Sequence, residues 1–216
     1  MPEVVLKNLP FLLHGLAVTA ELALLTIAGG TLIGLVVGVV RFRKVPVLGA
    51  AAALYVEIVR GTPLLVMLFI TYFAFPALLH YRTTAFAAAV LGFILFIGAY
   101  LAEDVRAGLR SVPQGQVDAA LALGLTRAQA LRFVVVPQAL RRMIPALFNQ
   151  YVRLAKFTSV ASVIGVTEFT GAALLVNARE FQPVPILLTV ALTYLVLCYG
   201  LSSIGRLLYA RLAVNA

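Results

Sequence analysis

The stretch that decides the fold class reads Asp118-Ala119-Ala120, then three residues to Gly124, then nine residues to Val134-Val135-Val136-Pro137. It lies between two long apolar segments of the chain. The two alanines keep one flank of the stretch slim enough to enter a groove on a partner. This combination of an acidic residue, small residues, a glycine and an apolar run closed by proline predicts a structured loop with a docking function.

Local signals around this stretch predict a helix, a sharp turn and a second helix. Pro113 can open a short helix over Gln114 to Leu123, and Gly124 tolerates a positive φ just past its end. Thr126 is followed three residues later by Gln129, which is the spacing of a capping box. The loop is therefore expected to project a small helical knob from the rest of the chain.

An amphipathic hairpin lying flat on the lipid surface is the competing interpretation of this loop. Arg127 and Arg132 would suit that role, because basic side chains favour a membrane interface. The local pattern alone leaves both interpretations open.

The composition indicates a membrane protein. Hydrophobic residues make up 62% of the 216 residues and charged residues only 12%, which is too apolar for a soluble domain of this length. The formal charge of +9 does not indicate nucleic-acid binding, because Lys and Arg are spread between apolar segments and form no single basic face.

Five segments are long enough to cross a hydrocarbon core of roughly 30 Å, which takes about 20 helical residues. They lie near Leu16 to Val40, Leu48 to Leu79, Ala85 to Val105, Ile144 to Val166 and Val184 to Leu208. The sequence predicts an all-α fold with one transmembrane domain over residues 1–216 and one long loop at about residues 106–143.

The distribution of Lys and Arg predicts the orientation, because cytoplasmic loops carry the excess of these residues. One side of the predicted topology holds Arg41, Arg43, Lys44, Arg106, Arg110, Arg127, Arg132, Arg141, Arg142, Arg206 and Arg211, and the other holds Lys7, Arg82 and Arg179. The N-terminus is expected outside and the C-terminus in the cytoplasm. The Asp118 loop is then cytoplasmic.

Small residues form a strip on the first span. Gly30, Gly34 and Gly38 follow one another at four-residue spacing, which lets another helix approach closely. Packing within this chain is the favoured explanation, with a contact between subunits as the alternative.

The second segment is interrupted by Arg60-Gly61-Thr62-Pro63. Proline removes a backbone donor and bends a helix, and broken helices at membrane depth often mark a substrate path. Glu57 precedes Arg60 by three residues, so the two can pair on one helix face. Glu57 and Arg60 are therefore candidates for the substrate path, and a structural ion pair is an equal alternative.

Polar residues recur on one face of the fourth span. Asn149, Arg153, Lys156 and Ser159 follow one another at three- to four-residue spacing, and Thr158 adds a hydroxyl nearby. Charges within membranes usually face the bundle interior or a water-filled cavity. These five residues are the predicted substrate pathway, and snorkelling of the two cations to the cytoplasmic surface is the alternative.

The Asp118 stretch resembles the E-A-A loop of the membrane subunits of bacterial ABC importers, in which Glu-Ala-Ala and Gly precede Ile-x-Leu-Pro at these spacings. The replacements at Asp118, Val134 and Val136 keep charge and apolar character. Further stretches resemble the polar amino acid subfamily: Arg60 to Pro63, Ala99 to Gly108, Pro137 to Arg141 and Lys156 to Val160. Phe157 departs from the polar residue usual in the last of these motifs.

The resemblance implies a type I ABC importer fold in the bacterial inner membrane. Its partners would be a cytoplasmic ATPase dimer, a second permease subunit of the same or a homologous chain, an extracytoplasmic solute-binding protein and the bilayer. The docking residues implied for the ATPase are Asp118, Ala119, Ala120, Leu123 and Gly124. The chain has no Gly-x-x-x-x-Gly-Lys-Ser/Thr sequence, so ATP and Mg²⁺ are expected on the partner ATPase and no cofactor on this chain.

Other function classes fit the sequence less well. A secondary carrier would show repeated halves, an intramembrane hydrolase would need a nucleophile and a base, and a metal site would need a ligand cluster. An ATP-independent channel remains the main alternative, although it leaves the cytoplasmic hairpin unexplained. Arg153 and Lys156 favour an anionic or zwitterionic ligand, which indicates a polar amino acid, with glutamate and aspartate as candidates.

Overall fold

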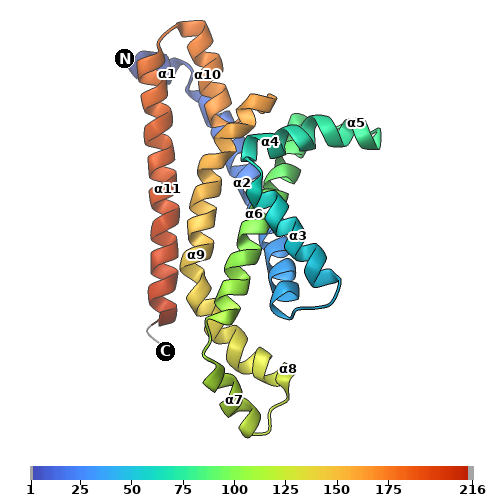
Figure 1. Ribbon diagram of the computed structural model, residues 1–216. Coiled ribbons are helices and arrows are strands. Elements are labelled where there is room, and N and C mark those ends of the chain that lie inside the picture. Colours follow the sequence, from blue (N-terminus) through green and yellow to red (C-terminus); the bar gives the residue numbers. More distant parts are fainter. Residues whose placement is uncertain (1, 214–216) are drawn as a thin grey trace.

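The computed structural model describes residues 2–213, and these form helices and turns with no strand. Long helices lie side by side, a short helical arm projects from them, and a helical hairpin lies at the far end (Figure 1). The elements are α1 (Pro2–Lys7), α2 (Leu9–Phe42), α3 (Leu48–Gly61), α4 (Leu64–Phe69), η1 (Ile70–Ala74), α5 (Phe75–Leu79), α6 (Ala85–Arg110), α7 (Gln114–Ala122), α8 (Arg127–Ala130), η2 (Leu131–Val135), α9 (Val136–Phe157), η3 (Thr158–Ile164), α10 (Phe169–Glu180) and α11 (Pro183–Ala213).

The helix lengths agree with the five predicted spans. Within the described residues, α2, α6 and α11 are each long and apolar enough to cross a membrane. Two bent helix pairs raise the number to five if each pair is one span. The first, third and fifth predicted spans are confirmed as helices, and each extends beyond the predicted bounds by a few residues.

The predicted interruption of the second span is confirmed and is sharper than a bend. Thr62 is extended, with φ −97° and ψ 133°, and α3 meets the α4 to α5 segment at 111°. A residue before proline is pushed out of the helical region, and Pro63 cannot donate to the preceding turn. The segment from α4 to α5 therefore leaves the bundle as the arm seen in Figure 1.

The fourth span begins earlier and ends differently from its prediction. The helix α9 starts at Val136, eight residues before the predicted start. It tightens into the 3₁₀ segment η3, which stops at Gly165 with φ 91°. The chain then continues into α10 at an angle of 50°. Glycine is favoured at this stop because the left-handed region carries no steric penalty for it.

The glycine strip of α2 packs against α6, as expected for contacts within the chain. A Cβ atom on Gly34 would lie 2.5 Å from Leu101 Cβ, and one on Gly38 would lie 2.8 Å from Ala102 O. Such close approach is available only to residues without a side chain. The strip thus sets the distance between α2 and α6.

Replacing Gly34 by alanine is expected to destabilise the protein. The new methyl group must displace Leu101, and overpacking of this kind costs about 1–3 kcal/mol. The melting temperature in detergent should fall by about 2–12 °C, at about 2–4 °C per kcal/mol. Gly200→Ala in α11 is the control, because no atom would lie within 4 Å of the added Cβ. An equal fall in both variants would contradict the packing role of Gly34.

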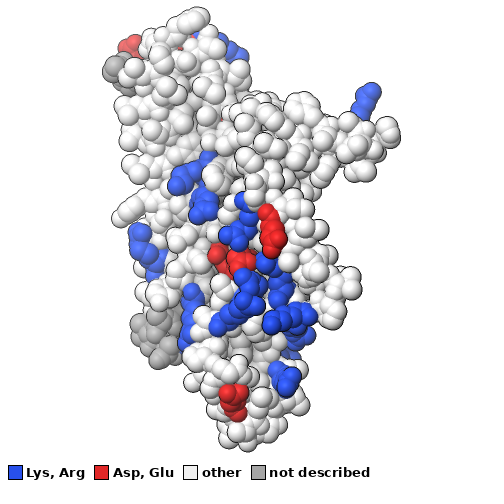
Figure 2. All heavy atoms as spheres, in the orientation of Figure 1, with Lys and Arg blue, Asp and Glu red and all other residues white. Residues whose placement is uncertain are grey.

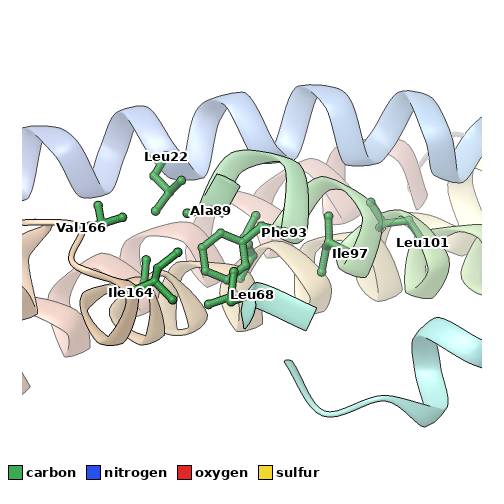
Figure 3. Packing of buried hydrophobic residues seen from close by; sticks show 10 residues of the cluster. Leu22, Leu68, Ala89, Phe93, Ile97, Leu101, Ile164 and Val166 are labelled. Carbon is green, nitrogen blue, oxygen red and sulfur yellow. The ribbon is translucent and has the colours of Figure 1, made fainter. Parts of the chain in front are cut away.

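The main core lies where α2, α4, α6 and η3 meet. Phe93 of α6 lies near Leu22 of α2, Ile164 of η3 and Leu68 of α4, and Ile97 follows further along α6 (Figure 3). All five side chains are buried. This core fixes the short η3 segment against α6, which positions the preceding helix α9 and its polar face.

A buried acidic residue joins three helices away from this core. Glu168 is 0% exposed and caps the N-terminus of α10, accepting hydrogen bonds from Thr170 N (2.9 Å) and Gly171 N (2.7 Å). It also accepts from Thr19 Oγ1 of α2 (3.3 Å) and from the Tyr194 hydroxyl of α11 (3.0 Å). No local sequence pattern indicates this linkage, because its side-chain partners are 149 and 26 residues away.

Candidate functional site

The hairpin formed by α7 and α8 has the predicted turn geometry. Gly124 adopts φ 85°. Gly124 N donates to Leu121 O (3.0 Å), and Leu125 N donates to Ala120 O (3.1 Å). This pair of bonds is the Schellman ending of a helix, which requires a left-handed residue at the position of Gly124. The local sequence therefore determines where α7 stops and how the chain turns.

The start of α8 is fixed by the capping box that the spacing predicts. Thr126 N donates to Gln129 Oε1 (2.8 Å), and Gln129 N donates to Thr126 Oγ1 (3.3 Å). Both bonds satisfy backbone donors that the first turn of a helix leaves free. The two helices are thus held at a defined angle by contacts within about ten residues of sequence.

The predicted docking residues of the hairpin do not all face outward. Asp118 and Ala119 are exposed, and Leu123 is 84% exposed. Ala120, in contrast, is only 4% exposed. The expectation that both alanines form a slim outer flank is therefore wrong for Ala120. Its small side chain is needed because the helix packs against the rest of the hairpin on that side.

A cavity of about 760 Å³ lies between α7, α8 and the end of α2. Asp118, Arg43 and Arg127 are the charged residues that line it, and Val117, Leu121 and Leu131 supply apolar wall. The Asp118 carboxyl accepts a hydrogen bond from Gln114 Nε2 at 3.0 Å. Asp118 therefore lies at the rim between this cavity and the exposed surface of α7.

Two predicted pathway cations meet at one aromatic ring. The Arg60 guanidinium lies 5.3 Å from the centroid of the Tyr100 ring, and that of Arg153 lies 5.7 Å from it. Arginine and an aromatic face attract each other at this range. Residues from α3, α6 and α9 are thereby brought together, although they are far apart in the sequence.

The partner predicted for Arg60 is wrong. Arg60 Nη1 lies 3.9 Å from Glu103 Oε2, and within the described residues Glu57 forms no ion pair. Glu103 also binds Arg41 Nη1 (2.6 Å) and Arg106. The break at Pro63 explains the difference, because it directs the end of α3 toward α6, where Glu103 is the nearest acidic side chain. Glu57 is exposed on α3.

The remaining predicted pathway residues separate along α9 and η3. Lys156 is exposed and has no ion pair in the described part of the chain. Asn149 is exposed beside α11, where it lines a cavity of about 300 Å³ with Ser202 and Arg206. Thr158 is fully buried and donates to Ala155 O (2.9 Å), while Ser159 donates to Lys156 O (2.7 Å). The two hydroxyls thus bond back to their own helix.

Three residues of this region were not predicted as site residues. Tyr100 receives both guanidinium groups, and Asp104 Oδ2 accepts from Gln150 Nε2 of α9 at 2.9 Å. Tyr100 and Asp104 lie in the Ala99 to Gly108 motif, which was the available signal. No sequence signal indicated Gln150, because this amide follows Asn149 directly and does not continue the three- to four-residue spacing of the polar face.

Phe157 has a packing role in the structure. Its ring lies 6.1 Å from that of Phe96 in an edge-to-face arrangement, and it packs against two of the apolar clusters. The departure from the polar residue expected there is thus accommodated by the apolar surroundings.

The family that matches residues 30–214 is described as the binding-protein-dependent transport system inner membrane component. The chain belongs to this family. The match covers α6, the hairpin and α9, where the predicted docking and pathway residues lie. As a member of this family the protein is a multi-pass component of the inner membrane, as the resemblance implied.

Close relatives support the assignment to permeases of ABC importers. The probable glutamine ABC transporter permease GlnP of Bacillus subtilis is 39% identical over 95% of this chain and 95% of its own length. The glutamine transport system permease GlnP of Escherichia coli is 38% identical over 95% and 94%, and the L-cystine permease TcyB of B. subtilis is 37% identical over 94% and 87%. The prediction of a transport subunit, not an enzyme, is confirmed by these permeases.

Solved structures confirm the type I importer fold. An amino acid ABC transporter crystallised with histidines has a chain that is 32% identical, with a TM-score of 0.90 and 96% coverage of both chains. The methionine ABC transporter MetNI, in an inward-facing conformation, has a chain with a TM-score of 0.83 at 20% identity, covering 95% of this chain and 98% of its own.

Proposed function

We propose that this family member is the permease subunit of an ATP-driven importer of polar amino acids, with residues 1–216 as a single transmembrane domain. Two copies, or one copy and a homologous chain, enclose the path, an ATPase dimer binds on the cytoplasmic side, and a solute-binding protein delivers the substrate outside. The observation that carries this proposal is the α7–α8 hairpin, which presents Asp118, Ala119 and Leu123 beyond the bundle. A channel that works without ATP has no use for this feature.

The charge distribution supports an outer N-terminus and a cytoplasmic hairpin. On the face that Figure 2 shows, most Lys and Arg side chains lie on the half that carries α7 and α8, and only a few lie at the opposite end and on the arm. The start of α2 lies at that opposite end, and α11 ends on the side of the hairpin (Figure 1). Residues 1 and 214–216 themselves lie outside the described residues. Excess positive charge belongs on the cytoplasmic side.

The proposed docking surface contains fewer residues than the predicted docking motif. Leu123 is the largest exposed apolar side chain of the hairpin tip, so its burial in an ATPase groove would remove apolar area from water. Asp118 and Ala119 lie on the accessible part of α7. Ala120 and Gly124 act indirectly, by packing the hairpin and by turning the chain. ATP and Mg²⁺ are assigned to the ATPase.

Co-purification of the chain with its ATPase tests the docking loop. Gly124→Val places a β-branched residue at φ 85°, where it is strained although no atom lies within 4 Å of the new Cβ. Capture of the ATPase should fall at least about fivefold, because the hairpin loses its turn. Gly124→Asn is the control, since asparagine tolerates the left-handed region. Its capture should stay near that of the wild type.

Each result of this comparison has a defined meaning. Capture by the wild type and by Gly124→Asn, with loss in a folded Gly124→Val, supports docking through the hairpin. Equal capture by all three chains contradicts that assignment. No capture by a monodisperse wild type would favour an ATP-independent channel or carrier.

We assign the substrate contact to the cationic face of α9. Within the described residues Lys156 is exposed and has no ion pair, and Arg153 faces Tyr100. A substrate carboxylate could therefore bind both cations. The relatives named for glutamine and L-cystine transport favour a zwitterionic polar amino acid as the substrate. An acidic amino acid is the alternative. Competition of L-glutamine against L-glutamate in uptake by the reconstituted importer distinguishes these two substrates.

A further inference from the structure

The loop between α2 and α3 lines a further cavity, of about 320 Å³, which we call the loop pocket. Its walls include Arg41, Lys44, Val45, Val47, Ala50 and Arg106. Leu48 N donates to Pro46 O (2.7 Å) across Val47, which has φ 63° and ψ −62°. This γ-turn is a strained geometry for a β-branched residue. It turns the Val47 side chain outward, where it is 82% exposed.

Positive charge is in excess around the loop pocket. Arg41 and Arg106 both bind Glu103, and Arg60 lies 3.9 Å from the same carboxyl group. Lys44 has no ion pair among the described residues. The Glu103 carboxylate is therefore shared by three guanidinium groups, and Lys44 adds a fourth cation. An anionic phosphate group in the pocket would give Lys44 a partner and offset the remaining positive charge, because guanidinium and ammonium groups bind phosphate strongly.

Apolar surface adjoins the charged groups. Val45, Val47 and Ala50 line the pocket itself, and Leu48 beside it is 62% exposed. The loop follows the end of the membrane-crossing α2, and Figure 2 shows Lys and Arg side chains gathered over this region. A ligand here must offer both an anionic group and hydrocarbon. A free anion in water leaves the exposed valine and leucine uncovered.

From this combination we propose that the loop pocket binds the phosphate headgroup of an anionic phospholipid, with Lys44 as its main contact. The lipid belongs to the leaflet on the hairpin side, which is cytoplasmic in the orientation proposed above. Arg41 and Arg106 stay paired with Glu103 and add positive potential, and the acyl chains extend past Val47 and Leu48. Basic pockets next to transmembrane helices on this side are suited to anionic lipid headgroups.

Native mass spectrometry of the full purified chain tests the proposal. The chain in neutral detergent is titrated with dioleoylphosphatidylglycerol and, separately, with dioleoylphosphatidylcholine. The wild type should bind the anionic lipid more tightly. Lys44→Gln should weaken that binding about fivefold and leave the zwitterionic lipid unchanged, as expected for one lysine at a membrane surface. Arg43→Gln is the matched control, because Arg43 is adjacent but lines the hairpin cavity instead.

Several results would overturn the proposal. Equal weakening by Lys44→Gln and Arg43→Gln would mean diffuse attraction without a defined site. Equal binding of the two lipids would mean that the pocket does not select a headgroup with net negative charge. Displacement of the bound lipid by inorganic phosphate at about 10 mM, with the total ionic strength held constant so that screening is unchanged, would indicate an aqueous anion site. Loss of ATPase capture in Lys44→Gln with unchanged lipid binding would make this a protein contact. None of these readouts depends on which amino acid is transported.

Discussion

Replacing Glu168 by alanine is expected to lower the melting temperature of the protein in detergent by about 6–12 °C. The buried carboxyl group accepts from Thr19, Tyr194 and two backbone N–H groups. On its loss Thr19 can still donate to Gly15 O (3.2 Å), whereas the other three donors lose this acceptor. Each unsatisfied buried donor costs about 1–3 kcal/mol. Three donors at the lower end of this range give about 3 kcal/mol, which corresponds to that shift at about 2–4 °C per kcal/mol. Thermal unfolding followed by fluorescence-detected size exclusion measures it.

Two variants make the result specific. Glu168→Gln keeps the size and one acceptor oxygen, so about half of the loss is expected. Glu21→Ala removes the same residue type from an exposed position of α2, where no hydrogen bond to the described residues is formed, and should shift the melting temperature by no more than about 2 °C. A loss of stability in Glu21→Ala as large as in Glu168→Ala would contradict the role of the buried network.

Replacing Lys156 by alanine is expected to reduce ATP-dependent uptake of L-glutamine at least tenfold while leaving assembly with the ATPase intact. The ammonium group has no partner within the described residues, so its removal costs no ion pair of the folded chain. A hydrogen bond from a charged group to a substrate carboxylate is worth about 1.5–3 kcal/mol, and 1.36 kcal/mol corresponds to tenfold. Uptake into proteoliposomes and ATPase co-purification are measured side by side.

Conservative and distant substitutions separate a substrate contact from a general charge effect. Lys156→Arg keeps the cation and should retain most of the uptake. Arg206→Ala removes a cation from α11, where it bonds Ser203 (2.8 Å), and should change uptake less than twofold. Normal uptake by Lys156→Ala would remove this residue from the path. Loss of uptake together with loss of the ATPase would make its role structural.

The hairpin shows which features could be predicted from the sequence. Gly124 determines the end of one helix, and the Thr126 to Gln129 spacing determines the start of the next. The hydrogen bonds involved join residues within six positions of each other, so both partners can be read from the local sequence. The break at Pro63 is equally local, because the proline itself removes the donor. Its angle of 111° was not predictable, since it depends on what the two pieces pack against.

The polar contacts show where sequence reasoning fails. Arg60 was paired with Glu57 because the two are three residues apart, whereas the structure places it at Glu103 and Tyr100 of another helix. Ala120 was assigned to the outer flank because nothing local shows which side of α7 meets the chain. The buried network of Glu168 has no local signal, because its side-chain partners are 149 and 26 residues away.

The sequence by itself determined the membrane class, the number of spans, the glycine strip and the hairpin with its turn. Each of these follows from apolar length, from residue spacing within one helix or from the conformational preferences of proline and glycine. Only the tertiary structure decided which cations share Glu103, which face of α7 is free and which carboxyl group is buried. Those outcomes depend on contacts between helices. The sequence of one helix does not show which neighbouring helix each of its faces contacts in the folded protein.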